Sequence, residues 1–440
     1  MSAASPTKAQ EDRLRRVLSL GLKACTTRQK SLNGSFCFLS KPMPHTRRYK
    51  TWWNTDAEVQ GQAIRAIQAF VSACKGRVQT IEKILLDDII SALEGLLKVA
   101  PEQLQSLAAD ITADILATSG SVFLGSRVQG LCASLVQLFS YTRSSSSCAV
   151  ALRIMINDAS KLSTNLDEKD FWAILKEGNI LDIVRNRLQA HAVFDGEGVP
   201  AYVSLAELCT AILHWRSMER FNLGSNVKFR KCILHHARSS NEAVCCAALR
   251  LYAALALCGG VALLQIQDTE DLCRCLVANT EVSKSSNVRT EAFHLLSVLS
   301  RSINLGTYLS ETVADTICTN INKTIMEQPL LSNTRWTPKT EKKLMEVVQA
   351  AKGLAYLPGS HHHSIGKTEL TTSISALLLE LYDIGSISYP KATKYDKMFA
   401  PHLWDALSWI FIYAPAENEE AYRRISQQDG LLSKLINFAW

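Results

Sequence analysis

The sequence has little proline and glycine for its length, with 11 prolines and 20 glycines in 440 residues. Antiparallel β-sandwiches and barrels need many turn residues, so this shortage disfavours them and favours long helices. The longest apolar run, Leu251 to Leu264, is shorter than the about 20 residues that a membrane helix needs. Residues 1–30 contain arginines but no uninterrupted apolar core, so no secretory signal is evident. We therefore expect no membrane segment, and a location in the cytoplasm, the nucleus or both.

Charged residues are also few, at 20% against 47% apolar residues, which excludes a disordered chain. The 13 cysteines are an odd number and lie mostly in apolar stretches, as Cys132, Cys209, Cys245 and Cys246 do. In the absence of a secretory signal, this distribution predicts buried thiols in a reducing compartment rather than disulfides.

The net charge of +7 is concentrated at the N-terminus. Residues 1–55 contain 11 Lys and Arg against Glu11 and Asp12, so this segment carries +9 and residues 56–440 carry −2. An amphipathic helix is predicted at residues 11–24, followed by a basic loop. We expect two regions, a basic N-terminal helix and loop at 1–55 and a helical repeat domain at 56–440.

Helical periodicity recurs from residue 55 onward. Four segments begin alike, with a valine, a small residue one turn later, and further apolar residues at i+7, i+8 and i+11. Their valines are Val59, Val128, Val244 and Val288. The run Ser239–Glu242 fits a capping box before the third segment. A second pattern places a glycine, Gly178 or Gly430, between two helices, where positive φ would let the chain turn sharply. Repetition at intervals of about 40 residues predicts an all-α, right-handed α-solenoid of armadillo/HEAT-like repeats.

The polar link followed by Gly-x-Ile/Leu-x-x-Leu/Ile-Val/Ile resembles the armadillo repeat, most clearly at 403–440. The run from Trp52 to Gln60 resembles the start of a plant family that joins armadillo-type repeats to C-terminal BTB/POZ domains. That resemblance implies substrate adaptors of cullin-based ubiquitin ligases. The sequence departs from the family's pattern because no BTB-like module precedes its end at Trp440, so we expect a shortened form.

Armadillo proteins that carry extended peptides present an asparagine late in each Ala-Leu-Ser-Asn segment. This sequence has none at the corresponding places, which read 63–66 Ala-Ile-Arg-Ala, 248–251 Ala-Leu-Arg-Leu, 292–295 Ala-Phe-His-Leu and 406–409 Ala-Leu-Ser-Trp. A peptide-import role through such asparagines is therefore disfavoured.

No motif indicates catalysis, a cofactor or a metal. The histidines at 361–363 point in different directions and lack cysteine or acidic ligands at zinc spacing. The residues Gly366-Lys367-Thr368 lack the glycine spacing of a phosphate-binding loop. Cys245 and Cys246 are predicted packing residues. Core or surface positions are expected for the four helical histidines, His214, His235, His236 and His294.

The basic N-terminal segment offers the one candidate for an anionic partner. Arg47, Arg48 and Lys50 lie beside Trp52 and Trp53, a combination that suits phosphate and base contacts. It equally suits a nuclear-import signal, or a solvated loop whose tryptophans pack on the first repeat.

These observations predict a non-enzymatic protein-interaction scaffold, with a protein partner on the concave solenoid surface. The resemblance adds the possible role of substrate recognition in a BTB-type ubiquitin ligase adaptor. The alternative is a nucleic-acid-associated or nuclear scaffold that uses the basic segment. We expect no membrane, small-molecule substrate, cofactor or metal.

Overall fold

A computed structural model describes residues 93–98, 102–119, 128–139, 145–160, 168–190, 198–257, 266–300, 313–323 and 338–356, with the single residues 90, 309, 374 and 427. All elements in these ranges are helices, and the expected all-α solenoid is confirmed. The chain divides into two compact units, Met1–Trp215 and Arg216–Trp440. The predicted boundary between residues 55 and 56 lies outside the described residues.

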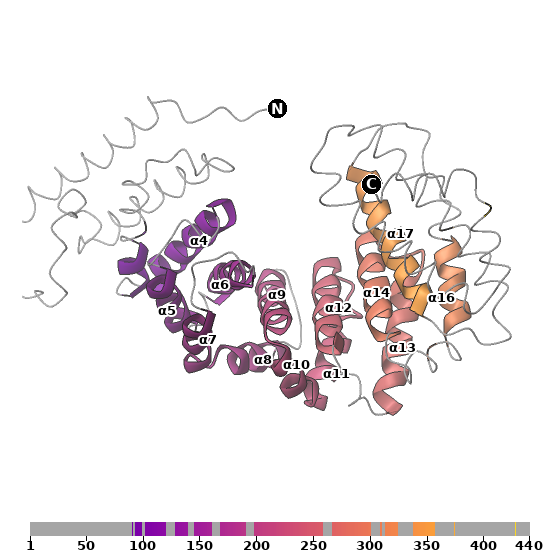
Figure 1. Ribbon diagram of the computed structural model, residues 1–440, viewed down its shortest axis with the longest axis horizontal. Helices are drawn as coiled ribbons and strands as arrows, with labels where there is room; N and C mark the ends of the chain where they lie inside the picture. Colours follow the sequence, from indigo (N-terminus) through magenta and orange to yellow (C-terminus); the bar gives the residue numbers. More distant parts are fainter. Residues whose placement is uncertain are drawn as a thin grey trace, which may run out of the picture. The chain divides into compact units, whose positions relative to one another are not determined.

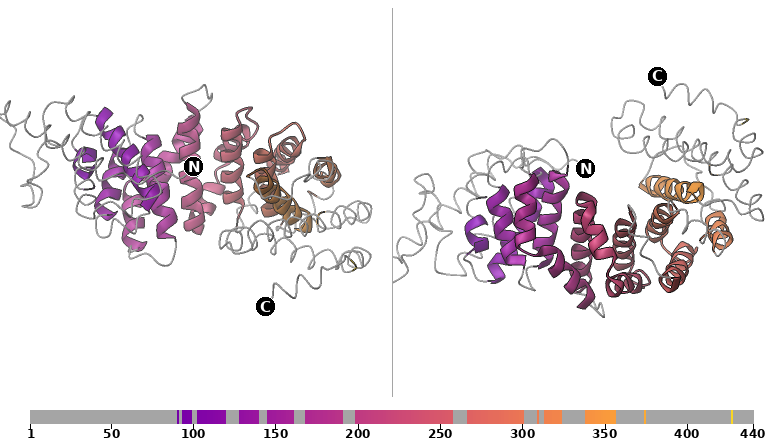
Figure 2. Two further views of the ribbon diagram at one scale, coloured as in Figure 1. Left: turned by 90° about the horizontal axis from the view of Figure 1, so that it is seen from above. Right: turned by 60° about the horizontal axis from the view of Figure 1, so that its bottom comes forward.

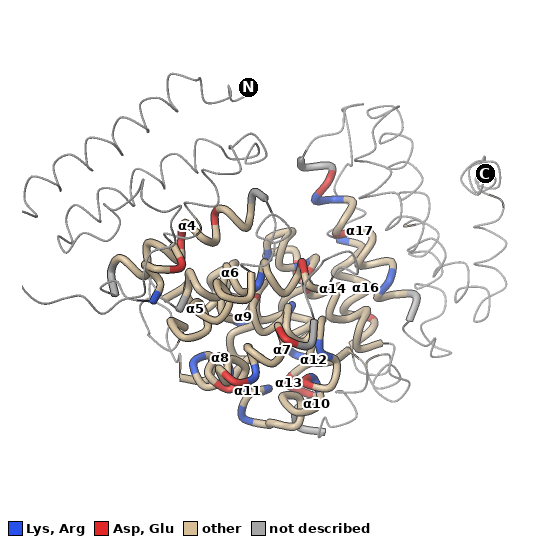
Figure 3. The backbone as a smooth tube through the Cα atoms, turned by 60° about the vertical axis from the view of Figure 1, so that its left-hand side comes forward, with Lys and Arg blue, Asp and Glu red and all other residues tan. Residues whose placement is uncertain are grey.

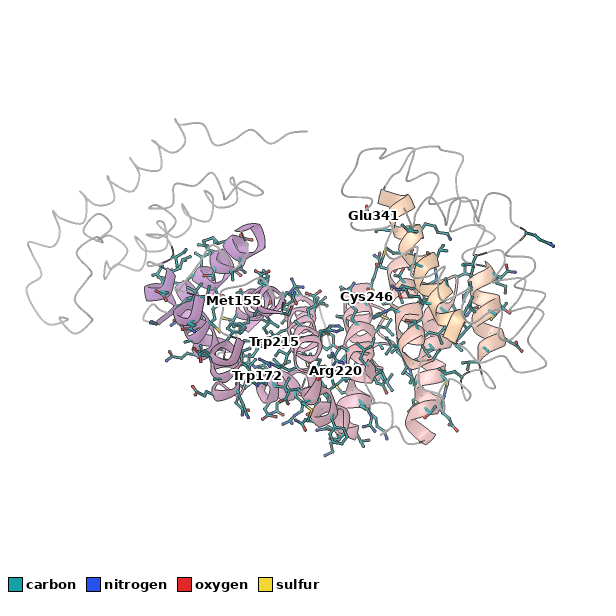
Figure 4. The ribbon with its side chains drawn as sticks, in the orientation of Figure 1. Met155, Trp172, Trp215, Arg220, Cys246 and Glu341 are labelled. Atoms are coloured by element: carbon teal, nitrogen blue, oxygen red, sulfur yellow. The ribbon has the colours of Figure 1, made fainter. Side chains whose placement is uncertain are left out.

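In the first unit, helices α4, α6 and α9 pack side by side as one layer, and α5, α7 and α8 form a second layer against it (Figure 1). The aromatic rings of Trp172 and Trp215 face each other edge to face at 5.7 Å, which joins α7 to the end of α9 (Figure 4). The helices span α4 Glu102–Ser119, α5 Val128–Phe139, α6 Ser145–Ala159, α7 Glu168–Glu177, α8 Ile180–Ala190 and α9 Gly198–Trp215.

The second unit repeats this arrangement, with α12, α14 and α17 as the first layer and α11, α13 and α16 as the second. Helix α10 packs against α11 and α12. Both views of Figure 2 show that the described elements of this unit, coloured from magenta to orange, are helices. The helices span α10 Ser217–Gly224, α11 Val227–His236, α12 Glu242–Ala256, α13 Ile266–Thr280, α14 Ser286–Leu299, α16 Ala314–Ile321 and α17 Pro338–Tyr356.

Three of the four predicted valine stripes are buried as expected. Each lies at or near the start of a described helix, at Val128 in α5, Val244 in α12 and Val288 in α14, and all their apolar members are buried. The stripe at Val59 lies outside the described residues. The sequence did not distinguish the layers, because α12 and α14 are first-layer helices whereas α5 belongs to the second layer. Both layers bury one apolar face, so the same spacing serves either position.

The cap of α12 differs from the predicted capping box. Asn241 is the N-cap, and its Oδ1 accepts hydrogen bonds from the backbone N–H groups of Ala243 and Val244. Glu242 is the first helical residue, so it is too early to return the hydrogen bond that a capping box requires. Ser239 contributes differently, since its Oγ accepts from the Asn241 N–H at 3.1 Å.

The turn between α7 and α8 also differs from the prediction. The residue with positive φ is Asn179, at 52°, and not Gly178. Asparagine tolerates this left-handed conformation better than most residues. Gly178 is needed for space, because a Cβ there would lie 2.1 Å from Cγ1 of Val136 on α5. The glycine therefore permits the close approach of this turn to the neighbouring helix.

Asparagines tie successive second-layer helices together in the second unit. Asn279 near the end of α13 is buried and donates from Nδ2 to the carbonyl of Ala237 after α11, at 2.8 Å. Asn320 near the end of α16 donates to the carbonyl of Val277 on α13 at 3.4 Å and to Oγ1 of Thr280 at 3.0 Å. Carbonyls at helix ends lack partners within the helix, so these side chains satisfy them from the next repeat.

Gly178→Ala should lower the free energy of unfolding by about 1–3 kcal/mol, because the new methyl group collides with Val136. Chemical denaturation would measure the loss. The double variant Gly178→Ala/Val136→Ala should recover part of it beyond additivity, and Asn179→Gly should be tolerated. Equal losses with and without Val136→Ala would show that space is not the constraint.

Candidate functional site

The first-layer helices are joined sideways by a set of polar pairs that we call the lateral ladder. In the first unit, Arg153 on α6 pairs with Glu207 on α9. In the second, Nε of Arg250 on α12 lies 2.6 Å from Oε1 of Glu291 on α14. His294 on α14 follows, with Nδ1 at 3.3 Å from Oε1 of Gln349 on α17. The ladder consists of Arg153, Glu207, Arg250, Glu291, His294 and Gln349.

In each polar pair of the ladder, the residue on the earlier helix occupies the same place in its repeat. Arg153 and Arg250 both follow Ala-Leu, and His294 follows Ala-Phe. Arg250 and His294 occupy the serine place of the Ala-Leu-Ser-Asn segment, one position before the asparagine of peptide-carrying armadillo proteins, and here they reach sideways to the next helix. The sequence patterns did not single out Ala-Leu-Arg at 151–153, because the helix at Val128 was grouped with the helices at Val244 and Val288. The recurrence of this tripeptide was the available signal.

The ladder lies at the surface above an apolar layer. The side chains of Arg250 and Arg153 are 44% and 32% exposed, while Cys246, one turn before Arg250 on α12, is buried (Figure 4). Burial raises the pKa of Glu291, and the charge and hydrogen bond of Arg250 oppose that rise. Arg250 therefore stabilises the charged form of Glu291 at a position that water solvates only in part.

A further polar contact joins α14 to the start of α12. Asn287 on α14 is exposed and donates from Nδ2 to Oε1 of Glu242 at 2.5 Å. On α17, Lys342 is exposed and Met345 and Gln349 are partly exposed, at the helical spacing that places them on one side. We call the surface formed by the exposed residues of α12, α14 and α17 the ladder face.

Beneath the ladder face, α14 and α17 are joined by a buried ion pair. Nε of Arg289 lies 2.5 Å from Oε1 of Glu346, and these side chains are 6% and 1% exposed. Oγ of Ser286 donates to the other carboxylate oxygen at 2.7 Å, and Arg289 also donates to the carbonyl of Lys284. Burial lowers the pKa of nearby Lys343, and the charge of Glu346 opposes that change. Every partner is supplied locally, so the charges are compensated within the interface.

The corresponding layer of the first unit uses hydroxyl groups. Ser147 on α6 donates to Asp110 on α4, and the hydroxyls of Ser146 and Ser204 on α9 lie 3.1 Å apart. Burial raises the pKa of Asp110, the hydrogen bond from Ser147 lowers it, and the charge of Asp114 raises it. Most positions along the described helices of both units are uncharged (Figure 3).

Several predicted candidates lie outside the described residues. These are Arg47, Arg48 and Lys50, together with the histidines at 361–363 and the segment 366–368. Among the four helical histidines, His214 and His235 are exposed and His236 is buried, with Nδ1 3.6 Å from Sγ of Cys232. Within the described ranges, no three potential metal ligands gather.

Cys245 and Cys246 are both buried, which confirms that they are packing residues. Burial raises the pKa of Cys245 to about 12 and that of Cys246 to about 11. Sγ of Cys245 donates to the carbonyl of Ala237 at 3.0 Å, beside the amide of Asn279. A thiol with so high a pKa is not a nucleophile at neutral pH.

No helix in the described part of the chain combines the length and apolar character that crossing a bilayer requires.

Glu346→Ala should lower the free energy of unfolding by about 3–5 kcal/mol, because it leaves the buried guanidinium of Arg289 without its counter-charge. Thermal or chemical denaturation would measure the change. The paired replacement Arg289→Met/Glu346→Leu removes both charges and should cost much less. A single variant no worse than the pair would contradict the buried-charge explanation.

Arg250→Met should destabilise the protein at neutral pH by roughly 1 kcal/mol, a modest value because the pair is partly exposed. Without the cation, the pKa of Glu291 rises further above the ordinary 4.5. A raised carboxyl pKa means that the folded state binds the proton more tightly, so stability falls as pH rises through it. The difference from the wild type should therefore shrink as pH is lowered toward about 4.5.

Denaturation midpoints at pH 7.5 and pH 5 would test this pH dependence. Arg274→Met is the matched control, because the side chain of Arg274 on α13 is 68% exposed and pairs with Glu270 and Asp271 of its own helix. A difference for Arg250→Met that does not depend on pH would contradict the role assigned to Glu291.

Residues 139–258, which run from α5 to the end of α12, match the family model described as Plant ARM repeat. A BTB/POZ domain-containing protein of Arabidopsis thaliana is 22% identical over 388 residues. That alignment covers 85% of this chain and 35% of the relative, so the chain spans about a third of the relative's length. The predicted resemblance to armadillo-type repeats of plant BTB/POZ proteins is confirmed.

Two solved structures are also similar. An engineered protein has 14% identity, with coverage of 84% of this chain and 99% of that one and a TM-score of 0.40. A mutant of Kap121p has 11% identity, with coverage of 94% and 45% and a TM-score of 0.35. These scores are too low to carry an argument, so the fold assignment rests on the helix layers and the repeat match.

Proposed function

We propose that this chain, a helical solenoid with plant ARM repeats in residues 139–258, is a non-enzymatic scaffold that binds a protein partner through the ladder face. The observation that carries the proposal is the row of partly exposed polar groups that crosses α12, α14 and α17. Solenoid repeats contact only their neighbours, so a surface that crosses several repeats remains available to a partner.

The chemistry of the ladder face suits side-chain recognition. Arg250 is fixed by Glu291, and His294 by Gln349, so their positions are set before a partner arrives. Pre-positioned polar groups lose less conformational entropy on binding. Because these residues already hold each other, they are less suited to clamp the backbone of an extended peptide than a row of free asparagines.

We further propose that the chain supplies the substrate-recognition part of a BTB-type ubiquitin ligase adaptor, in the cytoplasm or nucleus. Support comes from the alignment of 85% of the chain with a BTB/POZ domain-containing protein. In this arrangement the repeats hold the substrate and a BTB/POZ domain provides the link to a cullin. The purified 440-residue chain should then bind its partner without binding a cullin directly.

The basic segment 1–55 supports a second candidate function, binding of nucleic acid through Arg47, Arg48 and Lys50. Its charge of +9 is the favouring observation. Such binding should weaken steeply with salt, because neutralised phosphates release counterions. It should also disappear when residues 1–55 are deleted.

Affinity capture from plant extract, with and without nuclease treatment, tests the scaffold proposal. The full chain, a form without residues 1–55, and the triple variant Arg250→Ala/His294→Ala/Gln349→Ala would be compared by quantitative mass spectrometry. We expect protein partners kept by the first two forms and reduced at least ~10-fold by the triple variant, since central interface residues carry most of the binding energy.

Arg274→Ala on α13 is the matched surface control, and circular dichroism would confirm that each variant folds. Partners retained by the triple variant would refute binding through the ladder face. Partners lost with nuclease or with residues 1–55 would favour the nucleic-acid function. Direct binding of a purified cullin would contradict the proposed division between repeats and BTB/POZ domain.

A further inference from the structure

Helix α10 exposes two large apolar side chains on one side. Met218 is 78% exposed and Phe221 is 59% exposed, and their i, i+3 spacing places them next to each other on the helix. The opposite side of α10 buries Leu223 and Gly224. Only Val282, at 47%, joins these two as an exposed large hydrophobic residue among the described residues. The unfavourable hydration of two neighbouring apolar groups marks this site as unusual on a sparsely apolar surface.

Helix α11, which contacts α10, carries a basic stripe along its exposed side. Its exposed positions along one side are Lys228, Lys231, His235 and, just after the helix, Arg238. Arg238 is engaged with Asp271 on α13, at 2.7 Å to the backbone oxygen and 3.4 Å to Oδ1. For Lys228 and Lys231, the described residues contain no carboxylate within ion-pair distance. The buried side of the same helix carries Phe229, Arg230, Ile233, Leu234 and His236.

The two helices are held as a fixed pair. The buried guanidinium of Arg230 on α11 donates to the carbonyl of Gly224 at the end of α10. Asn226, in the short link between them, caps α11 by accepting a hydrogen bond from the N–H of Phe229 at 3.0 Å. Both helices also pack on α12. The exposed sides of α10 and α11 are therefore held in a fixed relation to each other.

We propose that this α10–α11 surface, made by Met218, Phe221, Lys228 and Lys231, binds an acidic segment of a partner protein that also supplies apolar side chains. Charge complementarity selects the partner, because no carboxylate of the described residues pairs with either lysine. The only acidic residue of α10, Glu219, is occupied by the side chain of Asn222 at 3.0 Å. Methionine and phenylalanine provide adaptable apolar contacts for the partner's own hydrophobic residues.

This surface is distinct from the ladder face, because it belongs to α10 and α11 and not to α12, α14 and α17. The proposal does not depend on the function proposed above. A protein segment is favoured over a nucleic acid or a membrane, because two apolar side chains beside two lysines match an amphipathic acidic peptide. A nucleic acid would use the lysines without needing Met218, and a bilayer would need a larger basic and apolar area.

Selection from a random-peptide display library against the full 440-residue chain tests the proposal. We expect enriched peptides to carry net negative charge and at least one aromatic or large aliphatic residue. Synthetic copies would be measured by fluorescence polarisation against Met218→Ser/Phe221→Ser and Lys228→Glu/Lys231→Glu. Each double variant should weaken binding at least ~10-fold, and raising the salt concentration should weaken the wild type by screening the lysines.

Val282→Ser and Lys323→Glu are matched controls, since they remove an exposed apolar residue and an exposed lysine elsewhere in the same unit, outside the ladder face. Both should bind like the wild type. A 20-nucleotide RNA and vesicles containing phosphatidylserine would be measured in parallel. Enriched peptides without negative charge, equal binding to the double variants, or stronger dependence of RNA or vesicle binding on these four residues would each overturn the proposal.

Discussion

Helix α12 has almost no surface of its own, because every residue from Val244 to Ala256 except Arg250 is buried. A helix that is apolar on nearly all sides is stable only between neighbours, and α11 and α14 supply them. Position 250 is therefore the one place between Val244 and Ala256 where a polar side chain can reach water. Arg250 occupies that position, and the nearest group available to it is Glu291 on the next helix. The lateral ladder is thus a consequence of how tightly the layer packs.

The buried contact between Arg289 and Glu346 serves a different purpose from the exposed rungs. Removing two charges from water costs about as much as their attraction returns, so the pair adds little net stability. A shifted register between α14 and α17 would leave one charge buried without a partner, at a much higher cost. The pair therefore favours one alignment of α14 and α17. The same alignment fixes the positions of the ladder-face residues that these two helices carry. Asn279 and Asn320 have a similar effect in the second layer.

The sequence predicted helices well where one apolar face repeats, as at Val128, Val244 and Val288. It could not assign the layer of the helix at Val128, because helices of both layers bury an apolar stripe with the same spacing. It placed the left-handed residue at Gly178 and not at Asn179, because both residue types accept positive φ and the crowding by Val136 comes from another helix. The recurring Ala-Leu-Arg could have marked the two arginines of the ladder, but their pairing could not be predicted, since the partners lie 41 to 55 positions apart in the chain.

In each unit, the reaction of the buried cysteines with an alkylating reagent reports how often the packed helices open. Burial raises the pKa of Cys132 and Cys209 in the first unit, and of Cys245 in the second, to about 12. At neutral pH these three thiols stay protonated and shielded, so an alkylating reagent does not reach them as nucleophiles while the helices stay together. Alkylation must wait for the helices to separate, and its rate then measures how often that happens. The native cysteines thus allow the opening rate of each unit to be measured without any label added to the chain.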